Sequence, residues 1–562
     1  MRSRVGRTTT KTVPEPASQS EDVFRSAGVT SAAVLASRVS GLVREGVMSR
    51  LFGAGMAYDA FVVGFRIPNL TRDLFAEGAL SAAFVPTFVE YMQNKGRKEA
   101  AHLANLVATA IILVVGALCV LGILASPWLV RLLTSEWVHE APQKYAQAVV
   151  LTQIMFPFLL LVALAAQAMG VLNALNQFAV PATSSTMFNI GSVGSGILLG
   201  FWLGPWLGLS RINGMAIGVV IGGALQLLWQ VPSLLREDIR FRFAFDFNHP
   251  GLRHILHLMG PGIIGNASVQ VNVVVATILA TRIHDPVRGL DGPVAWLGYA
   301  FRFMQLPLGL FGVAIATATL PAIGRSAASG DTAEFRETLA RSLGLTFLLT
   351  VPSSVGLIVL GKSMIGLIYE GVKFKAYDTE RTSLALACYA LGLAGYSAIK
   401  ILSPAFYALN DSRTPMYTSL ASIVVNAGLG YLFAFRLGLG HAGLALATAF
   451  VANFTFLALF WIMRQRIGGV YGRRLRDVVW KVLLASAVMA AAVWALSAGF
   501  HAAIHRAGVA RALDIFIGVP VGAAIVYLLC RVLQVEELAM ATRALGGPIL
   551  RRFPALAAKL GV

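Results

Sequence analysis

Apolar runs of about 20 residues recur along the whole chain, and each is long enough to cross the core of a bilayer as a helix. Hydrophobic residues make up 57% of the 562 residues and charged residues only 13%, whereas soluble domains carry about 25% charged residues. We count about 14 such runs between loop signals. The sequence therefore predicts an all-α polytopic membrane protein with about 14 transmembrane helices.

Basic residues gather in alternate connections between the runs, which accounts for the net charge of +19 without nucleic acid as a partner. The basic positions are Lys95, Arg97, Lys98, Arg236, Arg240, Arg242, Arg253, Arg464, Arg466, Arg473, Arg474, Arg476, Arg543, Arg551, Arg552 and Lys559. The connection at residues 135–143 carries no Lys or Arg. Because basic loops stay in the cytoplasm, both termini are expected there.

The chain also repeats itself. Phe65-Arg66 recurs as Phe301-Arg302, and Ala174-Leu175-Asn176 recurs as Ala408-Leu409-Asn410 at nearly the same spacing. Such repeats are common in transporters, whose substrates bind between the halves. We therefore expect two six-helix lobes around a central cavity plus two C-terminal helices. The expected divisions are a disordered N-terminal tail (1–24), an N-lobe (25–245), a C-lobe (246–470), two final helices (471–535) and a basic tail (536–562).

Charged residues inside the apolar runs are the candidate functional residues. A charge at bilayer depth costs at least ~2.5 kcal/mol, so such side chains usually face the interior of a bundle or a watery cavity. The candidates for binding an anionic substrate are Arg38, Arg44, Arg72, Arg302 and Lys400. Arginine suits phosphate because its fork of N–H groups matches the phosphate oxygens. The alternative is structural: pairing with Glu45, Asp73 or Glu77, or extension of the side chain to the interface.

Acidic residues near these arginines suggest a gate. Asp59 and Glu77 can pair with arginines in one conformation and release them in another. Glu45, next to Arg44, is a further gating candidate, and Gln305 is one by the family resemblance described below. No metal site is expected, since neither the histidines nor the three cysteines form a ligand cluster.

Two segments resemble the MurJ (MviN) family of lipid II flippases, within the MOP exporter superfamily. The first is SRVSGLVRE at residues 37–45, followed by FGAG at 52–55. The second runs from Pro68 to Pro86. Further matches are Arg302 with Pro307, and Lys400 with Pro404.

The resemblance implies the two-lobe fold, a bacterial inner-membrane location and a role in peptidoglycan synthesis. It implies headgroup contacts from Arg38, Arg44, Arg72 and Arg302, and two final helices that line a groove for the lipid tail. It also implies lipid II as the partner, together with membrane lipids and cell-wall synthesis proteins. Gln305 stands where some family members have Glu.

No cofactor is expected, and the sequence favours the membrane potential as the drive. Some family members build a sodium site with Asp, whereas this chain offers Asn266, Asn272 and Asn426, so sodium coupling is doubtful. Moving one charge through 100 mV is worth about 2.3 kcal/mol.

Three other functions are compatible with parts of the pattern. The nearest is a MOP-type transporter of another polyprenyl-linked oligosaccharide or of drugs, although drug export usually needs a carboxylate coupling site. A membrane enzyme acting on polyprenyl pyrophosphate requires acidic metal-binding motifs, which the sequence lacks. A scaffold for wall synthesis would depend on the basic tail.

Overall fold

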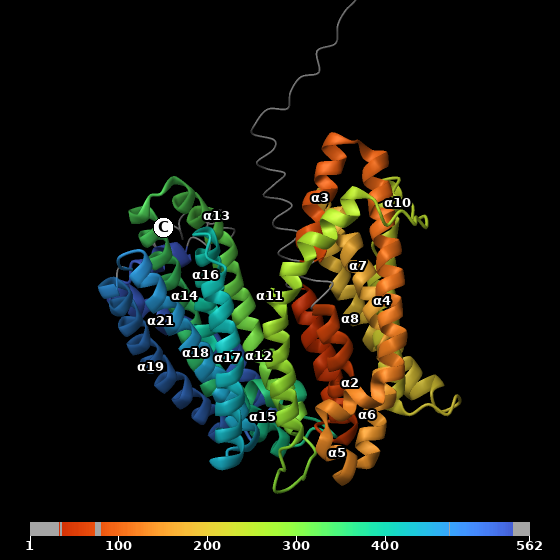
Figure 1. Ribbon diagram of the computed structural model, residues 1–562. Helices are drawn as coiled ribbons and strands as arrows, with labels where there is room; N and C mark the ends of the chain where they lie inside the picture. Colours follow the sequence, from red (N-terminus) through yellow and green to blue (C-terminus); the bar gives the residue numbers. More distant parts are fainter. Residues whose placement is uncertain (1–32, 34–35, 74–79, 471, 543–562) are drawn as a thin grey trace, which may run out of the picture.

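A computed structural model describes residue 33 and residues 36–73, 80–470 and 472–542, and the secondary structure of these residues is helical. Two groups of helices stand side by side in Figure 1, with α11 between them. The expected tail at residues 1–24, the gating candidate Glu77 and the last 20 residues of the chain (543–562) lie outside the described residues.

The N-terminal group contains a helix over residues 36–52 and the helices up to α10. Their bounds are α2 (Met56–Arg72), α3 (Ser81–Asn94), α4 (Arg97–Leu133), α5 (Ser135–Glu140), α6 (Pro142–Met155), α7 (Pro157–Ala174), α8 (Ala179–Ile197), the π-helical turns η2 (Leu198–Leu203), α9 (Arg211–Leu228) and α10 (Val231–Arg236). The long helix α11 (Pro250–Thr281) contacts α3 and α4 in this group and α12, α17 and α18 in the other.

The C-terminal group contains the remaining helices. Their bounds are α12 (Pro293–Pro307), η3 (Leu308–Val313), α13 (Ala314–Ser329), α14 (Thr332–Tyr369), α15 (Ala376–Ala390), α16 (Leu393–Ala408), α17 (Arg413–Tyr431), η4 (Leu432–Arg436), α18 (Gly440–Arg466), α19 (Gly472–Ala503), α20 (Ala507–Leu513), η5 (Asp514–Gly518) and α21 (Val519–Val532). Helices α19 and α21 pack on α14. Expected division points at 245/246 and 470/471 fall in connections between helices.

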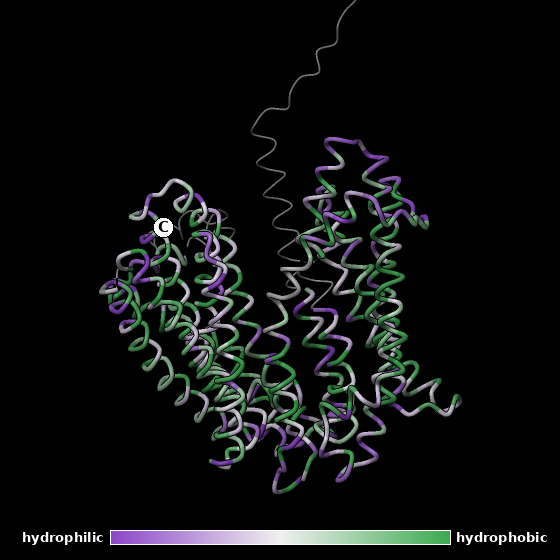
Figure 2. The backbone as a smooth tube through the Cα atoms, viewed as in Figure 1, coloured by the Kyte–Doolittle hydropathy of each residue, from purple (hydrophilic) through white to green (hydrophobic). Residues whose placement is uncertain are grey.

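Ten helices of the described residues are long and apolar enough to cross a membrane, or eleven if α15 and α16, bent by 42°, form one span. The expected number of 14 was larger, and it stays a prediction. Helix α2 has 17 residues and is followed by residues 74–79, which lie outside the described part of the chain, and Gln270–Thr281 is a shorter apolar stretch of α11. Figure 2 shows the apolar residues along the middle of the helices and the polar ones near their ends.

The two groups meet at one end of the molecule, which we call the joined end. A single apolar cluster there contains residues of both groups, among them the fully buried Trp137, Trp296, Tyr299 and Tyr369. Gly53 has a φ of +70°, and a Cβ at this position would lie 2.6 Å from the carbonyl oxygen of Lys373. The close approach of the two backbones therefore depends on glycine. The opposite end, with the connections at residues 95–98, 236–253 and 464–476, is called the basic end.

The repeated Ala-Leu-Asn segments adopt the same turn in both groups. Asn176 follows α7 with a φ of 60°, and Asn410 follows α16 with a φ of 56°. Asparagine tolerates this left-handed conformation better than β-branched residues. Just beyond the second turn, a backbone N–H bond from Thr414 holds the pKa of Asp411 below its usual range.

We expect Asn410→Val to destabilise the turn between α16 and α17 by about 1–2 kcal/mol, because valine strains at positive φ. Asn410→Gly is the matched control and should leave stability unchanged or higher. Thermal unfolding of the purified protein measures both. Equal melting temperatures for the valine and glycine variants would contradict the argument.

Candidate functional site

Glu45, on the helix over residues 36–52, is buried at the centre of a polar cluster. Arg44 Nη2 donates to Glu45 Oε1 at 3.0 Å, and Tyr58 Oη donates to Oε2 at 2.7 Å. Arg302 Nη2, from α12 in the other group, reaches Oε1 at 3.3 Å. One carboxylate thus holds guanidinium groups from both halves of the chain, and we call these four residues the Glu45 cluster.

The Glu45 cluster keeps donors free for a further anion. Each guanidinium has five N–H groups, and Glu45 occupies only part of them. The Arg302 side chain is 45% exposed and that of Arg44 16%. Two arginines and one carboxylate leave one positive charge, so the cluster can attract a phosphate-bearing ligand. Stacking of Tyr58 on Tyr299, with ring centroids 4.7 Å apart, fixes the tyrosine.

Arg38 lies against the end of α12 and the start of η3, in the other group. Its Nη1 donates to the carbonyl oxygen of Gln305 at 3.4 Å, and a Cβ added at Gly309 would meet the guanidinium at 2.2 Å. The Gln305 side chain also accepts a bond from Arg302 Nη1 at 3.4 Å. Gln305, expected as a gate, therefore contacts two candidate arginines.

The other two binding candidates lie apart from these contacts. Arg72 bonds to its neighbour Asp73 at 2.8 Å and 3.1 Å, as the structural alternative anticipated. Lys400 is exposed on α16, and no hydrogen bond or ion pair joins it to the Glu45 cluster among the described residues.

Asp59 is fully buried at the joined end, and its ion partner is a lysine. Lys144 Nζ, from α6, donates to Asp59 Oδ2 at 2.8 Å and to Asp291 Oδ1 at 2.9 Å. The backbone N–H groups of Gly292 and Ala295, at the start of α12, donate to Asp59 at 2.8 Å and 2.9 Å. In this conformation the ion partner of Asp59 is therefore a lysine, and its pairing with an arginine in another conformation stays a prediction. These contacts tie α2 and α6 to the C-terminal group.

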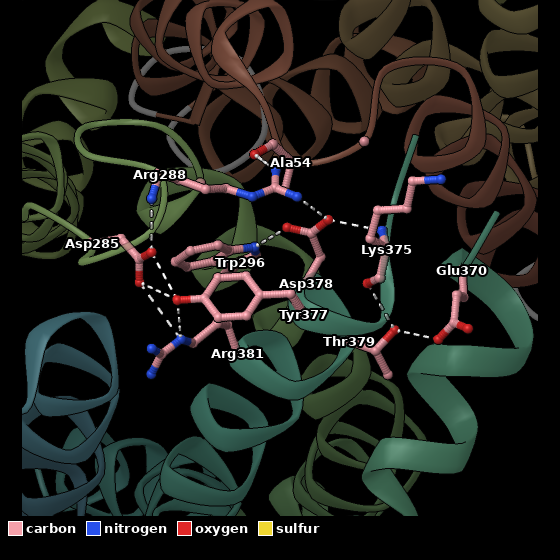
Figure 3. Close-up of polar contacts among 12 residues, drawn as sticks. Ala54, Asp285, Arg288, Trp296, Glu370, Lys375, Tyr377, Asp378, Thr379 and Arg381 are labelled. Atoms are coloured by element: carbon pink, nitrogen blue, oxygen red, sulfur yellow. Dashed lines mark hydrogen bonds and ion pairs between the residues drawn. The ribbon is translucent and has the colours of Figure 1, made fainter. Parts of the chain in front are cut away.

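A second buried carboxylate strengthens the joined end, as Figure 3 shows. Asp378 accepts bonds from Arg288 Nη2 at 2.8 Å, from Trp296 Nε1 at 3.0 Å and from the backbone N–H of Lys375 at 2.8 Å. Arg288 Nη1 also donates to the carbonyl oxygen of Ala54 in the N-terminal group, at 3.1 Å. The bond to Ala54 crosses between the two groups, so opening this end requires it to break.

Sequence reasoning missed Lys144, Arg288 and Asp378. Each lies at or beside a connection, where a charge normally faces water, and their partners are distant in sequence. Tyr58 was missed because a tyrosine in an apolar run usually serves packing. The signal that could have revealed Tyr58 was its position next to the charged Asp59.

The described residues contain no group of three His, Cys, Asp or Glu side chains placed to hold a metal. In the region discussed for sodium, Asn426 Nδ2 donates to Asn272 Oδ1 at 2.6 Å, which joins α17 to α11. The Asn266 side chain lies outside the description. Sodium coupling stays untested.

Comparisons with solved structures match this arrangement. A structure titled as lipid II flippase MurJ in an inward closed conformation aligns with a TM-score of 0.72 and 26% identity, covering 90% of this chain and 99% of that one. An inward-facing multidrug resistance MATE transporter of the MOP superfamily gives a TM-score of 0.63 at 14% identity, covering 79% and 98%. The second likeness concerns the fold alone.

Sequence comparisons give a specific family. The family model for lipid II flippase MurJ matches residues 48–507. The lipid II flippase MurJ of Burkholderia cenocepacia is 34% identical over 454 residues, which cover 80% of this chain and 85% of that protein. A probable lipid II flippase MurJ of Vibrio cholerae is 33% identical over 488 residues, covering 85% and 90%. The chain belongs to the MurJ family of lipid II flippases, transmembrane proteins of peptidoglycan synthesis in the bacterial inner membrane.

Proposed function

We propose that this chain moves lipid II from the cytoplasmic to the outer leaflet by alternating access between its two helix groups. The observation that carries the proposal is the convergence of Arg44 and Arg302, one from each group, on Glu45. A ligand that bonds to both arginines would couple the positions of the two groups, which alternating access requires.

The pyrophosphate of lipid II is the ligand that this chemistry fits. Its oxygens can accept forked bonds from Arg44 and Arg302, and they compete with Glu45 for the same N–H groups. Glu45 then serves as the gate, because it holds the arginines in place while the site is empty. Arg38, Arg72 and Lys400 would extend the positive field along a central cavity.

The joined end is the outer gate in this mechanism. Positive-inside topology places the basic end and both termini in the cytoplasm, so the joined end faces outward. Headgroup entry from the cytoplasmic side would be followed by release of the contacts that cross between the groups, Lys144–Asp291 and Arg288–Ala54. The polyprenyl tail would stay in lipid along α19 and α21. No covalent bond is made or broken, and the membrane potential supplies the drive.

The decisive experiment measures lipid II exposure at the outer face of cells depleted of their own flippase. Cells that carry this gene should regain exposure to near the undepleted level. Failure to regain it, with membrane insertion confirmed by fractionation, would contradict the lipid II assignment. Another polyprenyl-linked oligosaccharide would then be the leading cargo.

A further inference from the structure

The connection between α10 and α11 runs as an extended segment beside the first turns of α4. The Asn105 side chain donates to the carbonyl oxygen of Arg240 at 3.1 Å and accepts from the N–H of Arg242 at 3.3 Å. Thr109 Oγ1 accepts from the N–H of Ala244 at 3.1 Å. Because Asn105 and Thr109 are one helical turn apart, the segment follows α4 by about 6 Å toward the membrane interior. Residues 240–247 are called the Phe segment.

Four phenylalanines project from alternate positions of the Phe segment. Phe241, Phe243, Phe245 and Phe247 are 50%, 62%, 65% and 47% exposed. Neighbouring rings lie 4.9, 6.2 and 6.5 Å apart between centroids, and the row ends at a turn in which the N–H of Phe247 donates to the carbonyl oxygen of Phe245. Such a row of exposed rings, beside the end of a membrane helix, suits the boundary between headgroups and acyl chains.

A cleft of about 660 Å³ lies between the Phe segment and α4. Its lining includes the basic side chains of Lys98, His102, Arg240 and Arg242, and also the carboxylates of Asp238 and Asp246. Arg240 lies 3.5 Å from the carboxylate of Asp238. Among the described residues no carboxylate pairs with Lys98 or Arg242, so both cations are available to an anion.

We propose that this cleft binds the phosphate headgroup of an anionic membrane phospholipid, with the acyl chains against the phenylalanine row. Lys98 and Arg242 supply the charge complementarity, and the rings supply the apolar contact that a free phosphate would not use. This site lies at the basic end on the N-terminal group. It is separate from the Glu45 cluster and does not depend on the proposed transport.

A site-specific crosslink tests the proposal in the intact protein. Full-length chain with a photoreactive benzoylphenylalanine in place of Phe243 is placed in nanodiscs of phosphatidylethanolamine with about one-fifth phosphatidylglycerol. Mass spectrometry then identifies the captured lipids. We expect the ratio of captured phosphatidylglycerol to captured phosphatidylethanolamine to be at least about fivefold higher than the same ratio in the bulk lipid.

The double variant K98Q/R242Q should return the captured lipid to near the bulk composition. R413Q/R464Q removes two exposed arginines at the basic end of the other group and should keep the enrichment. Size-exclusion chromatography checks that both variants fold, and millimolar inorganic phosphate should leave the captured lipid unchanged.

Three results would overturn the proposal. The first is a captured lipid that matches the bulk composition when Lys98 and Arg242 are unchanged. The second is an enrichment that survives K98Q/R242Q, and the third is a crosslink that captures no lipid. Loss of the enrichment in millimolar phosphate would assign the site to free phosphate instead. Loss of lipid II flipping has no bearing on any of these readouts, so the two proposals fail separately.

Discussion

Replacing Arg302 with glutamine is expected to reduce outward lipid II exposure at least about thirtyfold while the protein still folds. The guanidinium is 45% exposed beside Glu45, so it can donate to a pyrophosphate that enters from the cavity side. Loss of one charge-assisted bond is worth about 2 kcal/mol, or about thirtyfold in rate. Arg302→Lys should restore the rate only in part, because lysine lacks the planar fork. The measurement is lipid II exposure in cells depleted of their own flippase.

The rival explanation is that Arg302 only neutralises Glu45. The double variant E45Q/R302Q separates the two roles. If the arginine is merely a counter-ion, E45Q/R302Q should transport as well as E45Q alone; if it binds substrate, the double variant should transport less than E45Q. Arg413→Gln, an exposed arginine at the basic end, is the matched control and should transport normally. Equal transport by E45Q and E45Q/R302Q would contradict the substrate contact.

The cost of burying charge explains which site residues the sequence revealed. Arg44 and Arg302 stand within apolar runs, where an unpaired cation is expensive, and the structure brings both to Glu45. The cost of a charge at membrane depth does not reveal which residue pairs with that charge, however. Arg72 met the same criterion and bonds to the adjacent Asp73, a contact that any sequence neighbour could provide.

The sequence pattern could not reveal the residues that close the joined end. Lys144 follows Pro142 at the start of α6, which is typical of a solvated helix end, yet its side chain is fully buried. The side chain is buried because the connection that leads into α12 covers it. Asp291 in this connection, which accepts a bond from Lys144, is 147 residues away in sequence. Contacts of this kind depend on how the two groups pack.

The helices themselves follow closely from composition. Apolar runs predict where α4, α14 and α18 lie, because only a helix satisfies its own backbone in a bilayer. The turn at Asn410 was visible as a repeat, and its positive φ gives the physical reason for asparagine at both copies. By contrast, the bend of 42° between α15 and α16 was not predicted from the sequence.

Replacing Lys144 with methionine is expected to open the joined end. The change leaves the Asp59 carboxylate buried without its cation, which costs about 3–5 kcal/mol in a conformation that keeps it buried. Separation of the two groups would let water reach Asp59, so the equilibrium shifts toward separated states. Spin labels at His139→Cys and Val372→Cys, on opposite groups, report this as a longer and broader distance distribution. Cys388→Ser removes the half-buried native thiol from the labelled protein.

The charge explanation requires that a second change reverses the first. D59N/K144M removes both charges and leaves a neutral amide near the N–H groups of Gly292 and Ala295, so the short distance should return in large part. Lys362→Met applies the same substitution to an exposed lysine and should not alter the distance. A distribution in K144M that matches the unaltered protein would show that this ion pair does not hold the end closed. Persistent opening in D59N/K144M would instead assign the effect to the lost contact between Lys144 and Asp291 or to lost packing around the lysine stem.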